Sequence, residues 1–159
     1  DLLEHVARIE ANIAEYDRIL SRMAKTDHRS QRLMELKGVG PTTACALVAS
    51  IGNAHDFKNG RQLAAWLGLT PSQYSSCGKS NLGRITKAGD SYLRTFLVQG
   101  GRSVLIGAEK KTDSFSRWVC SLIERRGYWR AVVAIAVKNA RLCWASLHYG
   151  DDVRLYSAS

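Results

Sequence analysis

The chain has 159 residues, 45% hydrophobic and 23% charged, which is typical of one globular domain with a sizeable core. No stretch approaches the run of about 18 apolar residues that a membrane-spanning helix needs, and the first residues lack the pattern of a signal peptide, so we expect no membrane partner. The net charge of +9 favours a polyanion, with DNA or RNA first; a basic protein without such a partner is the alternative.

Cysteine and histidine spacing argues against a zinc site and against a disulfide framework. The four cysteines include no CxxC pair, and three of them lie in apolar helical patterns as small core residues; only Cys77 lies in a polar segment. The four histidines are scattered, and none has metal-ligand spacing. The composition therefore predicts a cytoplasmic protein without a metal site in this chain.

Residues 1–26 predict a coiled-coil-like helix. Apolar residues alternate at spacings of four and three for about three heptads, with charged residues around them. Such a seam needs a partner helix, either in a second copy of this chain or elsewhere in a longer parent protein; packing on the chain's own domain is an equal alternative. The absence of an initiator methionine favours a fragment of a longer protein. The seam consists of Leu2, Val6, Ile9, Ile13, Tyr16, Leu20 and Met23.

Residues 27–159 predict an all-α domain. Asp90 is a plausible N-cap, and Gly100 and Gly101 fall on the apolar face of the helix that follows it, which predicts a close helix crossing. The segment from Ala131 to Val137 is apolar on all sides, so we expect it at the buried centre. Helices are predicted over residues 32–36, 41–51, 61–67, from 90 onward, 114–125 and 129–149.

Residues 33–49 have the pattern of a helix-hairpin-helix. Glycines before Pro41 let the backbone turn tightly and approach another backbone, and the proline marks the start of the second helix. The amide groups at that start would face outward and favour an anion such as a DNA phosphate, a contact that positions DNA without reading its sequence. An ordinary corner without a ligand is the alternative. The candidate nucleic-acid-binding residues are Gly38, Val39, Gly40 and Thr42.

Residues 70–89 are small, polar and basic, and predict a long loop that can contain a short β-hairpin. Its serines, Ser75 and Ser76, are surrounded by glycines and cations that suit a phosphate or a phosphoryl transition state. A serine nucleophile also needs a general base or a metal, and no histidine or carboxylate lies near the serines in sequence. The residue types alone thus favour phosphate binding over attack. The candidate cations are Lys79, Arg84, Lys87 and, in the following helix, Arg94.

Three blocks of sequence follow one another in order: residues 38–44, residues 63–71, and residues 74–79 continuing through 82–89 to 92–94. Together they resemble the C-terminal domain of the bridge-RNA-guided insertion-sequence transposases with an Asp-Glu-Asp-Asp tetrad, a family related to DNA invertases. The strict resemblance covers about half of the chain.

The resemblance implies that a serine of the loop attacks a DNA phosphodiester and forms a covalent serine–DNA link. Ser76 matches the nucleophile by position, and Ser75 is its close competitor. The tetrad and its Mg²⁺ belong to an N-terminal ribonuclease-H-like domain that this sequence lacks, so we expect the chain alone to bind nucleic acid weakly and to be inert. A guide RNA is the second partner that the resemblance implies.

One residue departs from the family pattern. Cys77 stands where the family usually has glycine, and cysteine does not readily adopt a positive φ. A non-catalytic helix-hairpin-helix module that grips DNA or RNA remains the alternative function, and its polar loop would then hold phosphate without attacking it.

Overall fold

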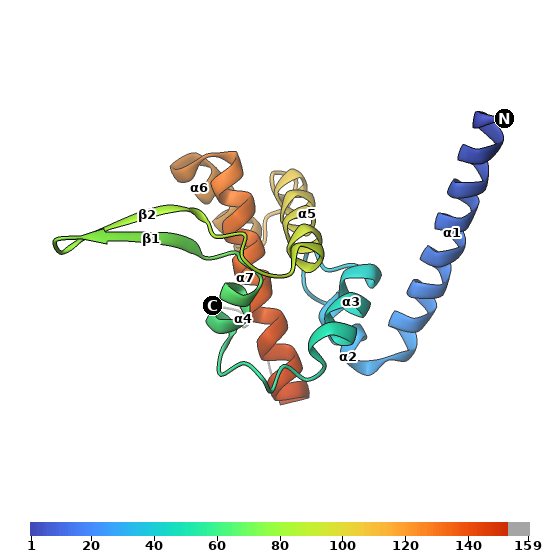
Figure 1. Ribbon diagram of the computed structural model, residues 1–159, viewed down its shortest axis with the longest axis horizontal. Helices are drawn as coiled ribbons and strands as arrows, with labels where there is room; N and C mark the ends of the chain where they lie inside the picture. The colour runs from blue at the N-terminus through green and yellow to red at the C-terminus, as the bar shows by residue number, and fades with distance from the viewer. Residues whose placement is uncertain (153–159) are drawn as a thin grey trace.

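The computed structural model describes residues 1–152, apart from the side chains of residues 74–76 and 79–81. The described chain is mainly helical and carries one two-stranded antiparallel sheet, which confirms the predicted all-α class and the short hairpin (Figure 1). In chain order the elements are α1 (Leu2–Thr26), α2 (His28–Met34), α3 (Pro41–Ile51), α4 (Gly60–Trp66), β1 (Pro71–Ser76), β2 (Lys79–Ile85), α5 (Ser91–Ala108), α6 (Ser114–Arg126), α7 (Tyr128–Tyr149) and the 3₁₀ turn η1 (Gly150–Asp152).

Short polar side chains mark most helix starts. Five of the helices have an Asp or Asn at the N-cap, and each of these side chains accepts a hydrogen bond from a backbone N–H of the first turn. The predicted cap at Asp90 is among them, since its Oδ1 lies 3.0 Å from the backbone N of Leu93. The caps are Asp1, Asp27, Asn59, Asp90 and Asp113.

Helix α7 is the axis of the domain and runs through its middle (Figure 1). Its first half packs with α5 and α6 in one apolar cluster, which includes Val119 and Ile135. Its second half packs with α2, α3, α4 and the start of α5 in a larger cluster, which includes Leu47 and Leu97. The predicted buried centre is confirmed, because Ala131, Val132, Ile135 and Ala136 are fully buried.

Two glycines of α5 allow close approaches. A Cβ on Gly101 would lie 2.8 Å from the carbonyl oxygen of Val132, so α5 and α7 cross there at close range, as predicted. A Cβ on Gly100 would lie 2.0 Å from the carbonyl oxygen of Gly38, so Gly100 instead meets the turn that precedes α3. The two positions together fix α5 against both α7 and that turn.

Helix α1 extends away from the other helices (Figure 1). Only its last turns contact the domain, where Ala24 is buried and the Leu20 carbonyl accepts a hydrogen bond from the Cys45 thiol at 3.6 Å. Further up the helix, the apolar seam is uncovered: Ile13 is 54% exposed and Tyr16 is 66% exposed. The alternative in which the whole seam packs on the chain's own domain is therefore wrong for this part of the helix. The division into residues 1–26 and 27–159 stays a prediction.

Burial separates the four cysteines. Cys143 is fully buried, and this burial raises the pKa of its thiol to about 12, so the side chain behaves as a small core residue. Cys45 and Cys120 are half-buried, whereas Cys77 is exposed. Within residues 1–152, none of the helices is both long enough and apolar enough to cross a bilayer.

Candidate nucleic-acid interface

The turn between α2 and α3 is held by three helices. Gly38 has a φ of +88° and lies against Gly100 of α5. The buried Asn139 of α7 donates from Nδ2 to the carbonyl oxygen of Lys37 at 2.9 Å. The Lys37 ammonium donates to Asp113, the N-cap of α6, and this hydrogen bond holds the pKa of that carboxyl well below its ordinary range. The turn is thus a fixed part of the domain.

This arrangement divides the four candidate residues of the turn. Gly38 faces α5, and the side chain of Val39 is only 5% exposed within the core. Gly40, by contrast, is exposed, and no heavy atom lies within 4 Å of where its Cβ would be. It is the N-cap of α3 and offers no side-chain cap, so the N–H group of the half-buried Thr42 is left to solvent or a ligand. An anion can therefore approach at Gly40 and Thr42, while Gly38 and Val39 support them from behind.

The strands β1 and β2 form a hairpin that projects from the helices (Figure 1). Ser76 pairs with Lys79 and Ser75 pairs with Ser80 in the backbone register, so both candidate serines lie next to the turn. Their side chains, and that of Lys79, lie outside the described residues. The backbone alone brings the cationic candidate Lys79 directly opposite Ser76.

The two-residue turn of the hairpin explains the departure at Cys77. Cys77 has a φ of +52° and Gly78 a φ of +78°, and two positive φ angles in succession define the type I′ turn that suits the twist of a hairpin. Cysteine thus adopts here the backbone conformation for which glycine or asparagine is preferred.

The substitution Cys77→Asn is expected to stabilise the hairpin locally by roughly 1 kcal/mol, because Asn-Gly is the preferred pair for a type I′ turn. Hydrogen exchange of the backbone amides of β1 and β2 should slow accordingly. Gly78→Ala, which puts a side chain at a positive φ, is the matched control and should speed the same exchange. Equal exchange rates in all three proteins would contradict this account of the turn.

The root of the hairpin is fastened to the end of α4. The backbone N of Lys87 donates to the carbonyl oxygen of Gly68 at 3.0 Å. Arg94 of α5 donates from Nη1 to the carbonyl oxygen of Leu67 at 3.1 Å and is half-buried. A Cβ on Gly89 would lie 1.8 Å from the carbonyl oxygen of Trp66, so the chain returning from the hairpin touches the helix end. Arg94 therefore positions the hairpin through the backbone, whatever else its guanidinium contacts.

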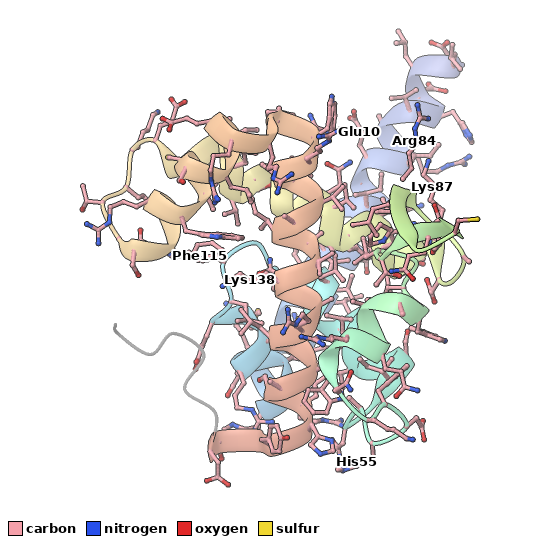
Figure 2. The ribbon with its side chains drawn as sticks, turned by 90° about the vertical axis from the view of Figure 1, so that its left-hand side faces the viewer. Glu10, His55, Arg84, Lys87, Phe115 and Lys138 are labelled. Carbon is pink, nitrogen blue, oxygen red and sulfur yellow. The ribbon has the colours of Figure 1, made fainter. Side chains whose placement is uncertain are left out.

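The other cationic candidates lie at the surface. Arg84 of β2 and Lys87 beyond it are exposed, and both lie on the hairpin side of the molecule (Figure 2). The carbonyl of Arg84 accepts a hydrogen bond from Ser72 Oγ at 3.1 Å, which ties the two strands at the base. These two side chains are placed to meet a phosphate backbone that runs along the hairpin.

Several histidines and carboxylates that could act as a base or a metal ligand contact other side chains, away from the hairpin serines. Arg32 and His28 both contact Asp151. These contacts lower the pKa of the Asp151 carboxyl, and the contact with Arg32 has the larger effect. His55 packs edge-on against His148, with ring centroids 5.1 Å apart. Within the described residues, no group of three or more His, Cys, Asp or Glu side chains could hold a metal ion. The described part of the chain therefore offers the hairpin serines no evident base or metal.

The sequence of this chain is similar to that of proteins named as transposases. The profile of the Transposase IS116/IS110/IS902 family matches residues 30–117, which run from α2 to the start of α6. A Pseudomonas aeruginosa protein described as a probable family 20 transposase is 46% identical over 147 residues, covering 92% of this chain and 44% of its own.

Two further relatives are similar in extent. The transposase for insertion sequence element IS1111A of Coxiella burnetii is 45% identical over 142 residues, covering 89% of this chain and 39% of its own. The transposase for insertion sequence element IS1328 of Yersinia enterocolitica is 34% identical over 143 residues, covering 90% of this chain and 43% of its own.

The class is thus that of insertion-sequence transposases. The chain belongs to the IS116/IS110/IS902 family of transposases. It spans less than half the length of these three curated relatives.

Proposed function

We propose that this chain is the DNA-binding, serine-bearing C-terminal part of an insertion-sequence transposase. In the proposed reaction, the Ser76 hydroxyl oxygen attacks the phosphorus of a DNA phosphodiester, forms a serine–phosphate bond and releases the hydroxyl of the adjoining strand end. Ser75 is the alternative nucleophile. The observation that carries the proposal is the projecting hairpin, whose backbone holds both serines beside a type I′ turn.

The proposed reaction needs a proton acceptor from beyond the described residues. Of the nearest candidates in sequence, His55, Asp56 and Asp90, two have other contacts: Asp90 caps α5, and His55 packs on His148. The family resemblance assigns Mg²⁺ to an Asp-Glu-Asp-Asp site in an N-terminal domain of the parent protein, and the described residues here do not fit that metal. We therefore expect this chain alone to hold no cofactor, to bind nucleic acid weakly and to be catalytically inert.

Two surfaces support the DNA contact in this proposal. The uncapped start of α3 offers backbone N–H groups at Gly40 and Thr42. The hairpin offers the exposed Arg84 and Lys87, and Lys79 in the register position opposite Ser76. Contacts of both kinds reach phosphates and position DNA, so they carry no direct sequence information. Target choice would then belong to other parts of the complex, including a guide RNA as the resemblance implies.

Charge reversal on the hairpin tests this contact. Lys79→Glu combined with Arg84→Glu in the full-length protein is expected to weaken binding to duplex DNA at least tenfold near 0.1 M salt and to flatten the salt dependence, because two phosphate contacts are lost. Fluorescence anisotropy with labelled DNA measures both quantities. The control pair, Lys110→Glu with Arg117→Glu, removes the same charge from exposed positions away from the hairpin. Equal losses in both pairs would contradict a hairpin-specific contact.

The uncovered seam of α1 supports self-association as part of the same proposal. Its apolar residues are spaced for a coiled coil, and Ile9 and Ile13 are 44% and 54% exposed. A matching helix from a second copy would cover them.

Replacing both residues in the full-length protein, Ile9→Asp and Ile13→Asp, is expected to lower the sedimenting mass from dimer to monomer. Each new carboxylate would have to be buried in the seam. Glu15→Lys, an exposed charge change on the same helix, is the control. An unchanged mass in the double variant would argue against self-association through α1.

A second function has support of its own. The chain could act as a non-catalytic helix-hairpin-helix module, since the start of α3 is exposed and uncapped while no base or metal site is evident among the described residues. In that case Ser76→Ala would leave every activity intact, whereas Gly40→Val would reduce DNA affinity by crowding the helix start. Family membership favours the transposase reading over this one.

A further inference from the structure

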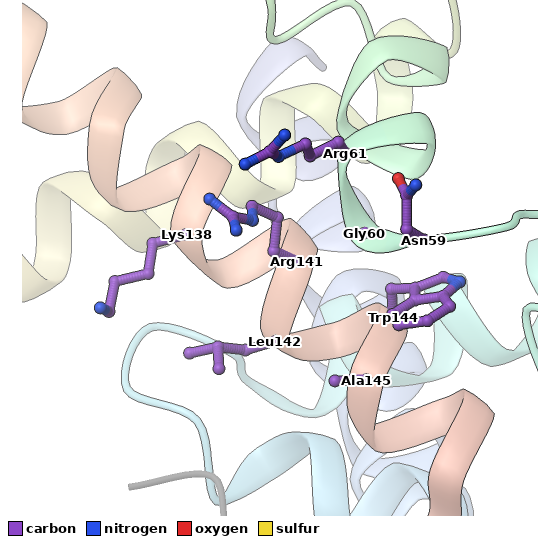
Figure 3. A pocket seen from close by; sticks show the side chains of 8 residues that line it. All are labelled: Asn59, Gly60, Arg61, Lys138, Arg141, Leu142, Trp144 and Ala145. Atoms are coloured by element: carbon purple, nitrogen blue, oxygen red, sulfur yellow. The ribbon is translucent and has the colours of Figure 1, made fainter.

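A basic groove lies where the start of α4 meets the second half of α7 (Figure 3). It is an open hollow of about 590 Å³. Its charged lining residues, Arg61, Lys138 and Arg141, are all cationic, and the described residues that line it include no carboxylate. No part of the function proposed above uses this groove.

Close packing of the two helices creates the groove. Gly60 is buried against α7, and a Cβ at this position would lie 2.8 Å from the Cα of Arg141. The backbone of α4 thus rests directly on α7 at Arg141, so the side chains of Arg61 and Arg141 leave the two helices next to each other. Figure 3 shows both guanidinium groups in the same part of the groove.

Two guanidinium groups placed in this way repel each other unless an anion lies between them. Both arginines are exposed, and among the residues that the structure describes neither forms an ion pair with a carboxylate. Guanidinium groups bind phosphate oxygens in a bidentate manner, which makes a pair of them a good phosphate clamp. The two arginines therefore form a suitable binding site for an anionic group of another molecule.

The aromatic residue that lines the groove offers little surface for base stacking. Trp144 is only 7% exposed, and its Nε1 donates to the carbonyl oxygen of Phe57 at 3.0 Å. Lys138 lies one turn before Arg141 on α7, with its Nζ 4.8 Å from the ring centroid of Trp118. The site thus recognises charge and the geometry of a phosphate, and it is open enough for a polymer to pass through.

We propose that the Arg61–Arg141 groove binds the sugar-phosphate backbone of a nucleic acid strand, as a second contact separate from the hairpin and the start of α3. Helix α4 links the two regions, because its first residue forms the groove and its last residues hold the hairpin root. With seven residues it is about 10 Å long, which corresponds to about three base steps along a strand. One nucleic acid can therefore contact both ends of α4.

The test compares the full-length protein with its double variant Arg61→Ala, Arg141→Ala, using labelled DNA duplex and RNA duplex of random sequence over a range of salt concentrations. The slope of log K against log salt is expected to become shallower by about 2, with at least tenfold weaker binding near 0.1 M salt. Arg61→Lys with Arg141→Lys should restore most of the slope, because the charges return without the bidentate geometry. Lys110→Ala with Arg117→Ala is the matched control and should change neither slope nor affinity by as much.

The outcomes separate the possible sources of the phosphate. A loss with DNA only or with RNA only supports the proposal and identifies the strand, and a loss with both supports a shared backbone contact. Unchanged slopes with both polymers would overturn the proposal. NMR titration measures the binding of inorganic phosphate; a double variant that loses this binding but still binds both polymers normally would also overturn the proposal. The hairpin double variant Lys79→Glu, Arg84→Glu is measured under the same conditions. If it loses binding and the groove variant does not, the groove proposal fails while the proposed function stands.

Discussion

Full-length protein carrying Ser76→Ala is expected to lose strand exchange by roughly 10⁴-fold or more while its affinity for DNA stays unchanged. The substitution removes one hydroxyl oxygen, which in the proposed reaction forms the bond to phosphorus. The backbone pairing of Ser76 with Lys79 and the exposed cations Arg84 and Lys87 do not depend on that oxygen. Binding and chemistry should therefore separate in this variant.

Ser75→Ala is the matched control, since it makes the same chemical change one residue earlier on β1. Strand exchange of this variant is expected to remain within about tenfold of the unsubstituted protein. Persistent exchange in Ser76→Ala together with lost exchange in Ser75→Ala would move the nucleophile to Ser75. Persistent exchange in both variants, and in the double variant, would favour the non-catalytic binding module.

Gly100→Ala is expected to destabilise the domain by about 3 kcal/mol or more. Its new Cβ would lie 2.0 Å from the carbonyl oxygen of Gly38, which is a backbone atom. The turn cannot yield easily, because Asn139 holds the carbonyl of Lys37 and the Lys37 side chain is held by Asp113. Either α5 or the turn must shift, and the packing of α5 or of the start of α3 is lost with it.

Urea unfolding of the variant and the unsubstituted chain measures this loss as a lower midpoint at an equal m-value. Gly107→Ala is the control on the same helix, because no heavy atom lies within 4 Å of its added Cβ. That change should be neutral or stabilise the helix by up to about 1 kcal/mol. Equal midpoints for the two alanine variants would contradict the close contact between α5 and the turn.

Local signals in the sequence predicted most helices well, but the helix expected over residues 32–36 is α2 (His28–Met34), which begins earlier because Asp27 caps it. Pro41 at the first position of α3 and Asp90 at the N-cap of α5 each act on the backbone of neighbouring residues, so their effect can be predicted without knowing the fold. Helix α1 could also be predicted from the sequence, because the spacing of its apolar residues follows the helix period. Much of the seam is exposed, and its partner helix stays a prediction.

The sequence indicated the hairpin only as one element that residues 70–89 can contain. Its strands are polar and lack a clear alternation of apolar residues, and Cys77-Gly78 is a weaker turn signal than Asn-Gly. The pairing of Ser76 with Lys79 follows from the turn, so a sequence without a recognisable turn could not reveal it. The hypothesis that Ser76 is the nucleophile came from the family resemblance, because the residue types alone favoured phosphate binding.

A close helix crossing at Gly100 and Gly101 could be predicted, but not which distant residues would meet. Gly38 was expected to serve the approach of DNA but meets Gly100, and Val39 is buried in the core. Arg61 and Arg141 belong to no common motif, and the close packing of α4 on α7 at the buried Gly60 brings them together. Each of these contacts depends on tertiary packing.

The central claim is that a serine of this hairpin becomes covalently joined to DNA. The most direct test incubates the full-length protein with Mg²⁺, end-labelled substrate DNA and the guide RNA that the family resemblance implies. It isolates any adduct that survives denaturation and maps the modified residue by mass spectrometry. The account predicts a DNA phosphate on Ser76. An adduct on Ser75 would correct the site and keep the function, whereas intact DNA binding without any adduct would contradict the serine mechanism and leave a module that grips phosphate without attacking it.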